Sequence, residues 1–326
     1  MDNKPVMLIT SIGKRVQLIQ HLKKSFKIIG VDAGNDNPAK YFVDMFYQIP
    51  KAIEENYIEV LINICKSENV QLLVPLYEGE FEVLNENKNK FQDVNTKVVL
   101  SSKEVINICK NKEETYKFFT LHNIKTPKAY DDNEIDDVIR YGDIDKLPLF
   151  IKPKDGMGSS NAFKINNMKE LLFFKDYVKN PIIQECIDGD EYTVDCLVDF
   201  DGQSVYVVPR KRLEVRSGEV VKSRTVRDIE IIDKTIEVIN LLNKCKDSSE
   251  CGTSGPLTIQ FFKTASGEIY LLEINPRFGG GVPLSFECNA DYGKALREIL
   301  SGEKVEFKNE FLEKTMLRYE QAVFIS

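Results

Sequence analysis

The sequence is poor in the residues that several common kinds of active site require. Of its 326 residues only two are histidines, His21 and His122. Both lie in stretches with helical spacing, where a structural role is favoured, so a histidine-based zinc site or a Ser-His-Asp triad has little material. The 18 glycines and 12 prolines are too few for a collagen or a low-complexity chain. Any chemistry must therefore rest on carboxylates, amides, lysines and arginines.

Disulfide bonds, a membrane span and a signal peptide are not expected either. The seven cysteines are an odd number and no two have CxxC spacing, so we expect reduced thiols. No stretch reaches the roughly 18 consecutive apolar residues of a membrane span, and the first apolar run is too short for a signal peptide. We therefore expect a cytoplasmic protein with no membrane partner.

The charge balance disfavours a nucleic-acid partner. Lysine and arginine number 44 against 51 aspartates and glutamates, which gives a formal net charge of −7. Nucleic-acid binders usually carry a basic surplus. We expect no nucleic-acid partner, although a local basic groove could still hold phosphate groups.

The first third of the chain has the pattern of an α/β domain. Short apolar runs alternate with amphipathic stretches up to about residue 105, which is typical of βαβ units and a doubly wound parallel sheet. These runs are residues 5–10, 26–31, 72–76 and 97–100.

The remainder has the pattern of an α+β body with antiparallel sheets. One or two helices are expected at 103–123, followed by a turn-rich connector at 124–134. Residues 191–199 return through 204–209 after Asp201-Gly202, which is a strong hairpin signal. Further short strands are expected at 149–153, 182–187, 257–263 and 268–274, and helices at 169–178, 228–243 and 290–300.

The densest group of polar residues follows the last predicted hairpin. Because side chains alternate along a strand, Glu273 and Asn275 point to one face, and Gln260 on the partner strand can fall beside them. Carboxylate and amide oxygens suit Mg²⁺. Arg277 and a glycine run at 279–281 come next, and the guanidinium could grip a phosphoryl oxygen. The alternative is an ordinary hairpin with a glycine turn.

A second candidate site follows the predicted strand that ends near Lys152. The loop after it contains Gly156, Gly158, Ser159 and Ser160, whose main-chain N–H groups could cradle phosphates beside the lysine charge. It is neither a P-loop nor a dinucleotide-binding fingerprint, because GxxxxGK[ST] and GxGxxG are both absent. An ordinary turn is the alternative.

Three weaker candidates complete the pattern. The strand-turn-strand segment around Glu185 could form a hinge whose backbone reads an adenine, with Glu191 on the ribose. Glu78 and Glu80 follow a predicted strand at the edge where open α/β sheets bind ligands, and could meet an amino group. Arg15 could meet a carboxylate. A charged hairpin, a helix N-cap and a solvated helix start are the respective alternatives.

In this order the segments resemble the ATP-grasp superfamily, above all a single ATP-grasp unit of the carbamoyl-phosphate synthase large subunit and the pyrrolysine-pathway lysine ligase. The resemblance covers nearly the whole chain, and its most specific part runs from Gln260 to Glu273-Ile-Asn-Pro-Arg-Phe-Gly-Gly-Gly. It implies a pre-ATP-grasp domain at 1–105, a small lid with the phosphate loop at 106–185, and a C-terminal subdomain with the metal site at 186–326.

The resemblance also implies roles for individual residues. Lys112 and Lys152 would lie near the ATP phosphates, under the loop 155–160. Glu185 and Ile187 would meet adenine and Glu191 the ribose. Gln260, Glu273 and Asn275 would hold one or two Mg²⁺ ions, with Mn²⁺ as a substitute, and Arg277 would contact the transferred phosphoryl group. Lys211, Arg212 and Arg216 precede a Gly218-Glu219 turn that resembles the family's loop covering the site, and the loop 214–224 would close with it; a solvated loop is the alternative for this basic run.

The implied activity is ATP-dependent ligation of a small-molecule carboxylate to an amine. The carboxylate would become an acyl phosphate, and attack by the amine would release phosphate after ADP. The resemblance also allows a homodimer. Two alternatives stay open: a small-molecule kinase that stops at phosphoryl transfer, and a nucleotide-binding regulator without turnover. With a single ATP-grasp unit, synthesis of carbamoyl phosphate by this chain alone is not expected.

Overall fold

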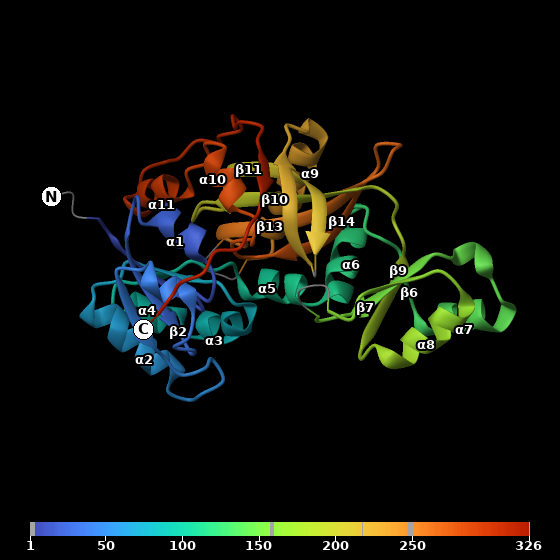
Figure 1. Ribbon diagram of the computed structural model, residues 1–326, viewed down its shortest axis with the longest axis horizontal. Helices are drawn as coiled ribbons and strands as arrows, with labels where there is room; N and C mark the ends of the chain where they lie inside the picture. The colour runs from blue at the N-terminus through green and yellow to red at the C-terminus, as the bar shows by residue number, and fades with distance from the viewer. Residues whose placement is uncertain (1–3, 157–159, 217, 247–250, 326) are drawn as a thin grey trace.

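The computed structural model describes residues 4–156, 160–216, 218–246 and 251–325. It contains three β-sheets, which Figure 1 shows in a row. The five-stranded sheet lies at the left (blue), the six-stranded sheet above the centre (yellow to orange), and the four-stranded sheet projects to the right (green).

The first sheet is fully parallel, with strand order β3-β2-β1-β4-β5. Both of its faces are covered, so β1 and β4 are buried almost throughout, as in doubly wound folds. The expected α/β class is therefore confirmed. The strands are β1 Val6–Thr10, β2 Lys27–Asp32, β3 Met45–Gln48, β4 Leu72–Pro75 and β5 Lys97–Val98. The helices are α1 Val16–Leu22, α2 Tyr57–Ser67, α3 Phe81–Glu86 and α4 Lys88–Gln92, with 3₁₀ turns at Pro38–Tyr41 and Glu78–Glu80.

Two helices connect this sheet to the rest of the chain. They are α5 Lys103–Lys110 and α6 Lys112–Leu121. The side chains of Ser102 and Asn111 accept hydrogen bonds from the first turns and so fix where each helix begins. Buried Val105 and Phe119 belong to the main hydrophobic core beneath the six-stranded sheet.

The four-stranded sheet, which we call the lid, has its own core. Its strand order is β6-β9-β7-β8, all antiparallel. Eight buried residues, among them Ile135, Leu149 and Leu171, form a separate hydrophobic cluster. Its elements are β6 Ala129–Tyr130, α7 Asp132–Tyr141, β7 Leu149–Pro153, β8 Phe163–Ile165, α8 Met168–Tyr177 and β9 Pro181–Glu185, with a 3₁₀ turn at Ile144–Lys146.

The six-stranded sheet is antiparallel, with order β14-β13-β10-β11-β12-β15. One face is apolar: Val194, Ile259 and Ile274 lie in one row across three strands and are buried. The opposite face carries the alternate, polar residues of the same strands. The strands are β10 Asp190–Val198, β11 Ser204–Arg216, β12 Glu219–Thr225, β13 Gly255–Lys263, β14 Ile269–Asn275 and β15 Thr315–Leu317. The helices are α9 Ile229–Asn243, α10 Pro283–Glu287 and α11 Tyr292–Leu300.

Two segments differ from the expectation. The predicted loop at 214–224 is mostly a hairpin, because β11 continues to Arg216 and β12 begins at Glu219. The connector at 124–134 ends in a helix, because Asp131 and Glu134 form a capping box at the start of α7. Among the described residues, no helix is both long and apolar enough to cross a membrane.

Candidate functional site

A row of oxygen-bearing side chains crosses the polar face of the six-stranded sheet. Gln260 on β13 pairs directly with Glu273 on β14, and Thr258 pairs with Asn275. The Asn275 amide donates to Glu273 Oε1 at 2.8 Å. The register therefore places the three candidate metal ligands on one face, at the end of the last hairpin.

Lys152 lies near this row, and Lys112 lies near Lys152. Burial lowers the pKa of Lys152, at the end of β7 in the lid, to about 8, while the Glu273 charge opposes this shift and the Lys112 charge adds to it. The Lys112 ammonium donates to the Gly156 carbonyl at 2.7 Å. The lid, α6 and the six-stranded sheet thus bring two cations and one carboxylate together, which is an arrangement suited to a phosphate chain with a cation.

The predicted phosphate loop is described only in part. Gly156 belongs to it through the contact with Lys112, and Ser160 is exposed. Gly158 and Ser159 lie outside the described residues. At the hinge, Glu185 ends β9 and its carboxylate accepts the Lys128 backbone N–H at 2.9 Å, while Ile187 follows in the half-buried link to β10.

Glu191 lies on the polar face of the sheet, opposite the basic strand β11. Its carboxylate is 3.3 Å from the Arg212 guanidinium. Burial raises the pKa of Glu191, the Arg212 charge opposes that shift and Glu273 adds to it. Arg212 thus lies beside Glu191 on the polar face. The largely exposed Arg216 side chain pairs instead with Glu214, and exposed Asp190 holds Lys211 at 2.5 Å.

Arg277 connects the sheet to the first domain. Its guanidinium pairs with Glu78 at 2.9 Å and donates to Asn275 Oδ1 at 3.2 Å. Glu78 thus binds an arginine in this structure. Glu80 is buried and accepts hydrogen bonds from the Thr10 and Ser11 hydroxyls. Burial raises the pKa of Glu80, and these hydrogen bonds oppose the shift.

Sequence reasoning missed a buried ion pair beneath the glycine run. Arg210 on β11 binds Asp195 on β10 through two hydrogen bonds, of 2.6 and 3.0 Å, and the Ser285 hydroxyl donates to the same carboxylate at 2.6 Å. Both charged side chains are about 2% exposed. The alternation of Glu191, Thr193 and Asp195 along one strand is the signal that could have found this pair.

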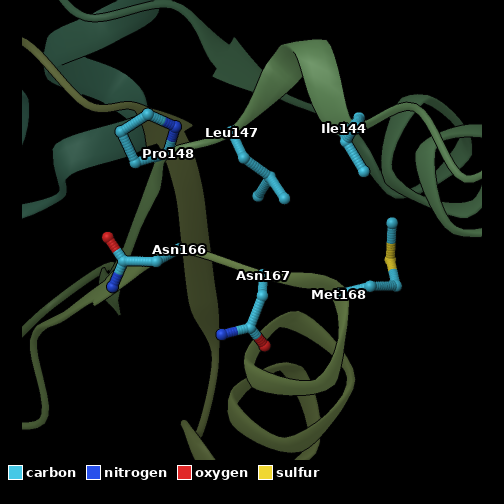
Figure 2. A pocket seen from close by; sticks show the side chains of 6 residues that line it. All are labelled: Ile144, Leu147, Pro148, Asn166, Asn167 and Met168. Atoms are coloured by element: carbon cyan, nitrogen blue, oxygen red, sulfur yellow. The ribbon is translucent and has the colours of Figure 1, made fainter.

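The pocket shown in Figure 2 is separate from this row of side chains. It has a volume of about 400 Å³ and lies on the lid, near the N-terminus of α8. Its six lining residues carry no charge, and the amides of Asn166 and Asn167 both donate to Glu170. The pocket therefore offers nothing that would bind a phosphate chain. Its lining residues are Ile144, Leu147, Pro148, Asn166, Asn167 and Met168.

Comparison with protein families agrees with this architecture. A family described as "ATP-grasp domain" matches residues 109–281, more than half of the chain. The chain belongs to the ATP-grasp family. Residues 7–99 match a second family, described as "PylC-like, N-terminal domain". The ATP-grasp match includes both lysines, the lid, the row formed by Gln260, Glu273 and Asn275, and Arg277.

The relatives found by sequence comparison share a low identity with this chain. The carbamoyl phosphate synthase large chain of Thermoanaerobacter sp. is 25% identical over 290 residues, which cover 83% of this chain and 26% of that protein. The D-alanine–D-alanine ligase of Fusobacterium nucleatum is 28% identical over 172 residues, covering 52% and 56%. This ATP-grasp chain thus spans about a quarter of the synthase large chains that it matches.

Solved structures support the same fold. N5-carboxyaminoimidazole synthetase from Staphylococcus aureus superposes with a TM-score of 0.70 at 18% identity, covering 94% of this chain and 79% of that one. L-amino acid ligase from Bacillus licheniformis superposes with a TM-score of 0.65 at 16% identity, covering 92% and 75%. At these identities the likeness concerns the ATP-grasp fold alone.

Proposed function

We propose that this protein is an ATP-dependent carboxylate–amine ligase that releases ADP and phosphate. The observation that supports it most is the convergence of Lys152 and Lys112 on the row formed by Gln260, Glu273 and Asn275. The chemistry of the donors suits Mg²⁺, since the three side chains offer one carboxylate and two amide oxygens, which are hard ligands. A bound Mg²⁺ would supply charge neutralisation at the phosphates.

In this proposal the chain's own residues contribute positioning and charge. Lys152 and Lys112 hold the nucleotide phosphates, and Glu191 receives the ribose hydroxyls. Arg277, already oriented by Glu78, compensates the negative charge that develops as the phosphoryl group passes to the substrate carboxylate. The lid excludes water from the resulting acyl phosphate. An amine then attacks the acyl carbon and phosphate leaves, so a C–N bond replaces the C–O bond.

An ADP-release screen tests the proposal. The purified protein is incubated with Mg²⁺-ATP, single carboxylic acids and amino acids, and pairs of them, and products are identified by mass spectrometry. We expect ADP, phosphate and an amide in equal amounts. Accumulation of a stable phosphorylated acid would instead identify a kinase, and nucleotide binding without any ADP would identify a regulator.

The perturbed lysine predicts how nucleotide binding depends on pH. Lys152 has a folded-state pKa of about 8, so it is charged below that pH and neutral above it. Phosphates favour the charged form, so ADP without added metal should bind with proton uptake and about tenfold more weakly at pH 9 than at pH 7. Calorimetry in buffers of different ionisation enthalpy measures both effects. Lys152→Met should weaken binding and flatten the pH profile; an unchanged profile in the variant would contradict this role.

A further inference from the structure

Basic side chains from three parts of the chain gather where the first domain meets the glycine run. Lys14 and Arg15 follow β1, Arg277 follows β14, and Arg318 follows β15. The Arg277 and Arg318 charges both act on Arg15. Most of these cations have acidic partners. Lys14 lies 2.7 Å from Glu219, Arg318 lies 3.5 Å from the same carboxylate, and Arg277 is held by Glu78.

Arg15 is the exception in this group. Within the described ranges its guanidinium has no hydrogen bond or ion pair, although the residue is half-buried. Burial lowers its pKa to about 10, the Arg277 and Arg318 charges add to that shift, and the Glu219 charge opposes it only in part. A cation that has lost part of its water and gained no partner is unfavourable, so an anion that paired with Arg15 would be stabilised there.

The glycine run at 279–281 lies between Arg15 and the candidate metal ligands Gln260, Glu273 and Asn275. A Cβ on Gly279 would lie 2.8 Å from Thr258 Oγ1, and one on Gly281 would lie 2.6 Å from Arg210 Nη1, so both glycines face the sheet. A Cβ on Gly280 would instead lie 3.2 Å from Arg15 Nη1. Arg15 therefore meets the turn from the first-domain side, away from the candidate metal ligands.

We propose that Arg15 binds an oxyanion of the acid substrate, distinct from the carboxylate that is phosphorylated. This inference rests on the proposed function. In the proposed reaction the reacting carboxylate binds beside Arg277 and Asn275, on the sheet side of the glycine run. Arg15 lies on the first-domain side of that run and has no partner among the described residues. Three further cations, those of Lys14, Arg277 and Arg318, lie around Arg15. The carboxylates paired with them are those of Glu78 and Glu219, so this group of side chains has more positive than negative charges. The substrate class is an acid with a second anionic group, either a carboxylate or a phosphate.

Binding to Arg15 can be measured without turnover. The probes are succinate, O-phospho-L-serine and the corresponding amides that lack an anionic group, succinamide and L-serinamide, added to the protein with ADP and Mg²⁺. The NMR signal of the Arg15 Nε–H group, assigned by its loss in Arg15→Met, should shift in a saturable way with an anionic probe below about 50 mM. The two amides without an anionic group should leave this signal in place. No saturable shift with either anion would overturn the proposal.

Turnover then distinguishes the two sources of the oxyanion. In ADP release, succinate is compared with succinamate, and O-phospho-L-serine with L-serine. For the accepted acid, KM should be about tenfold to a hundredfold lower than for its partner that lacks the second anion. Arg15→Met should remove this preference with kcat largely unchanged, and Arg15→Lys should restore part of it. Equal KM values within both pairs would contradict the proposal.

Two variants separate a specific contact from general charge. Lys14→Met removes a neighbouring cation that already has a partner, so the preference for the dianion should persist. If Lys14→Met and Arg15→Met act alike, the effect is long-range electrostatics and the proposal fails.

Gly280→Ala places a methyl group against the flexible end of Arg15, so the fold should persist while the NMR shift weakens. A saturable NMR shift, together with no ADP release in the full screen of acids and amino acids, would reject the ligase proposal and keep the anion site.

Discussion

Replacing Glu273 by alanine is expected to reduce ADP release by roughly a thousandfold or more, because a bound cation contributes several kcal/mol of charge stabilisation in phosphoryl transfer. Glu273 supplies the only charged side chain among the three candidate ligands. Its side chain is half-buried at the rim of the sheet, so the free energy of unfolding should change by about 1 kcal/mol at most. Steady-state kinetics and denaturant unfolding measure the two effects.

The matched control is Glu268→Ala, at the other end of the same hairpin. Glu268 is exposed and pairs with Lys125 far from the polar row. This variant should retain full activity and stability. Should Glu273→Ala unfold the protein, or should it keep normal turnover, the proposed role of Glu273 as a metal ligand is wrong.

Asp195→Asn is expected to lower the free energy of unfolding by about 3–5 kcal/mol, since it leaves the buried Arg210 charge without its carboxylate. The pair is almost completely inaccessible to water, and the Ser285 hydroxyl completes its hydrogen bonding. The change in the denaturant midpoint measures the loss. A wild-type midpoint would show that Arg210 finds another partner.

Two further variants test the cause of this loss. Asp190 begins the same strand, and its pair with Lys211 is largely exposed, so Asp190→Asn should cost less than about 1 kcal/mol. The double variant Asp195→Leu with Arg210→Met removes both charges, and should be more stable than Asp195→Leu alone. A double variant as unstable as the single one would locate the loss in packing.

Local patterns in the sequence were sufficient for much of the fold and for the core of the candidate site. The alternation of Glu273 and Asn275, and the short turn back to Gln260, predicted one shared face, and the hairpin register has that arrangement. The alternation of strands and helices before residue 105 likewise predicted the parallel sheet. In these segments, residues close in sequence determine which side chains meet. The roles assigned to them remain predictions.

Contacts between segments that are far apart in the sequence could not be predicted from local patterns. The pair of Glu78 and Arg277 joins residues 199 positions apart, so neither shows in sequence that it neutralises the other. The strand β12 contains lysine, serine and arginine and resembles a solvated loop, yet it is held between β11 and β15. The helix α7 begins in Asp131-Asp132-Asn133, residues that favour turns, and only the capping box with Glu134 marks its start.

The separate hydrophobic cluster of the lid has a consequence for how the molecule opens. Its eight buried residues share no cluster with the six-stranded sheet, so the lid can lose its order while the larger body stays folded. Backbone amides of β7 and β9 should exchange with deuterium sooner than those of β10 and β13. A nucleotide that bridges Lys152 to the sheet would slow the lid amides most, and the difference would report occupancy directly, residue by residue.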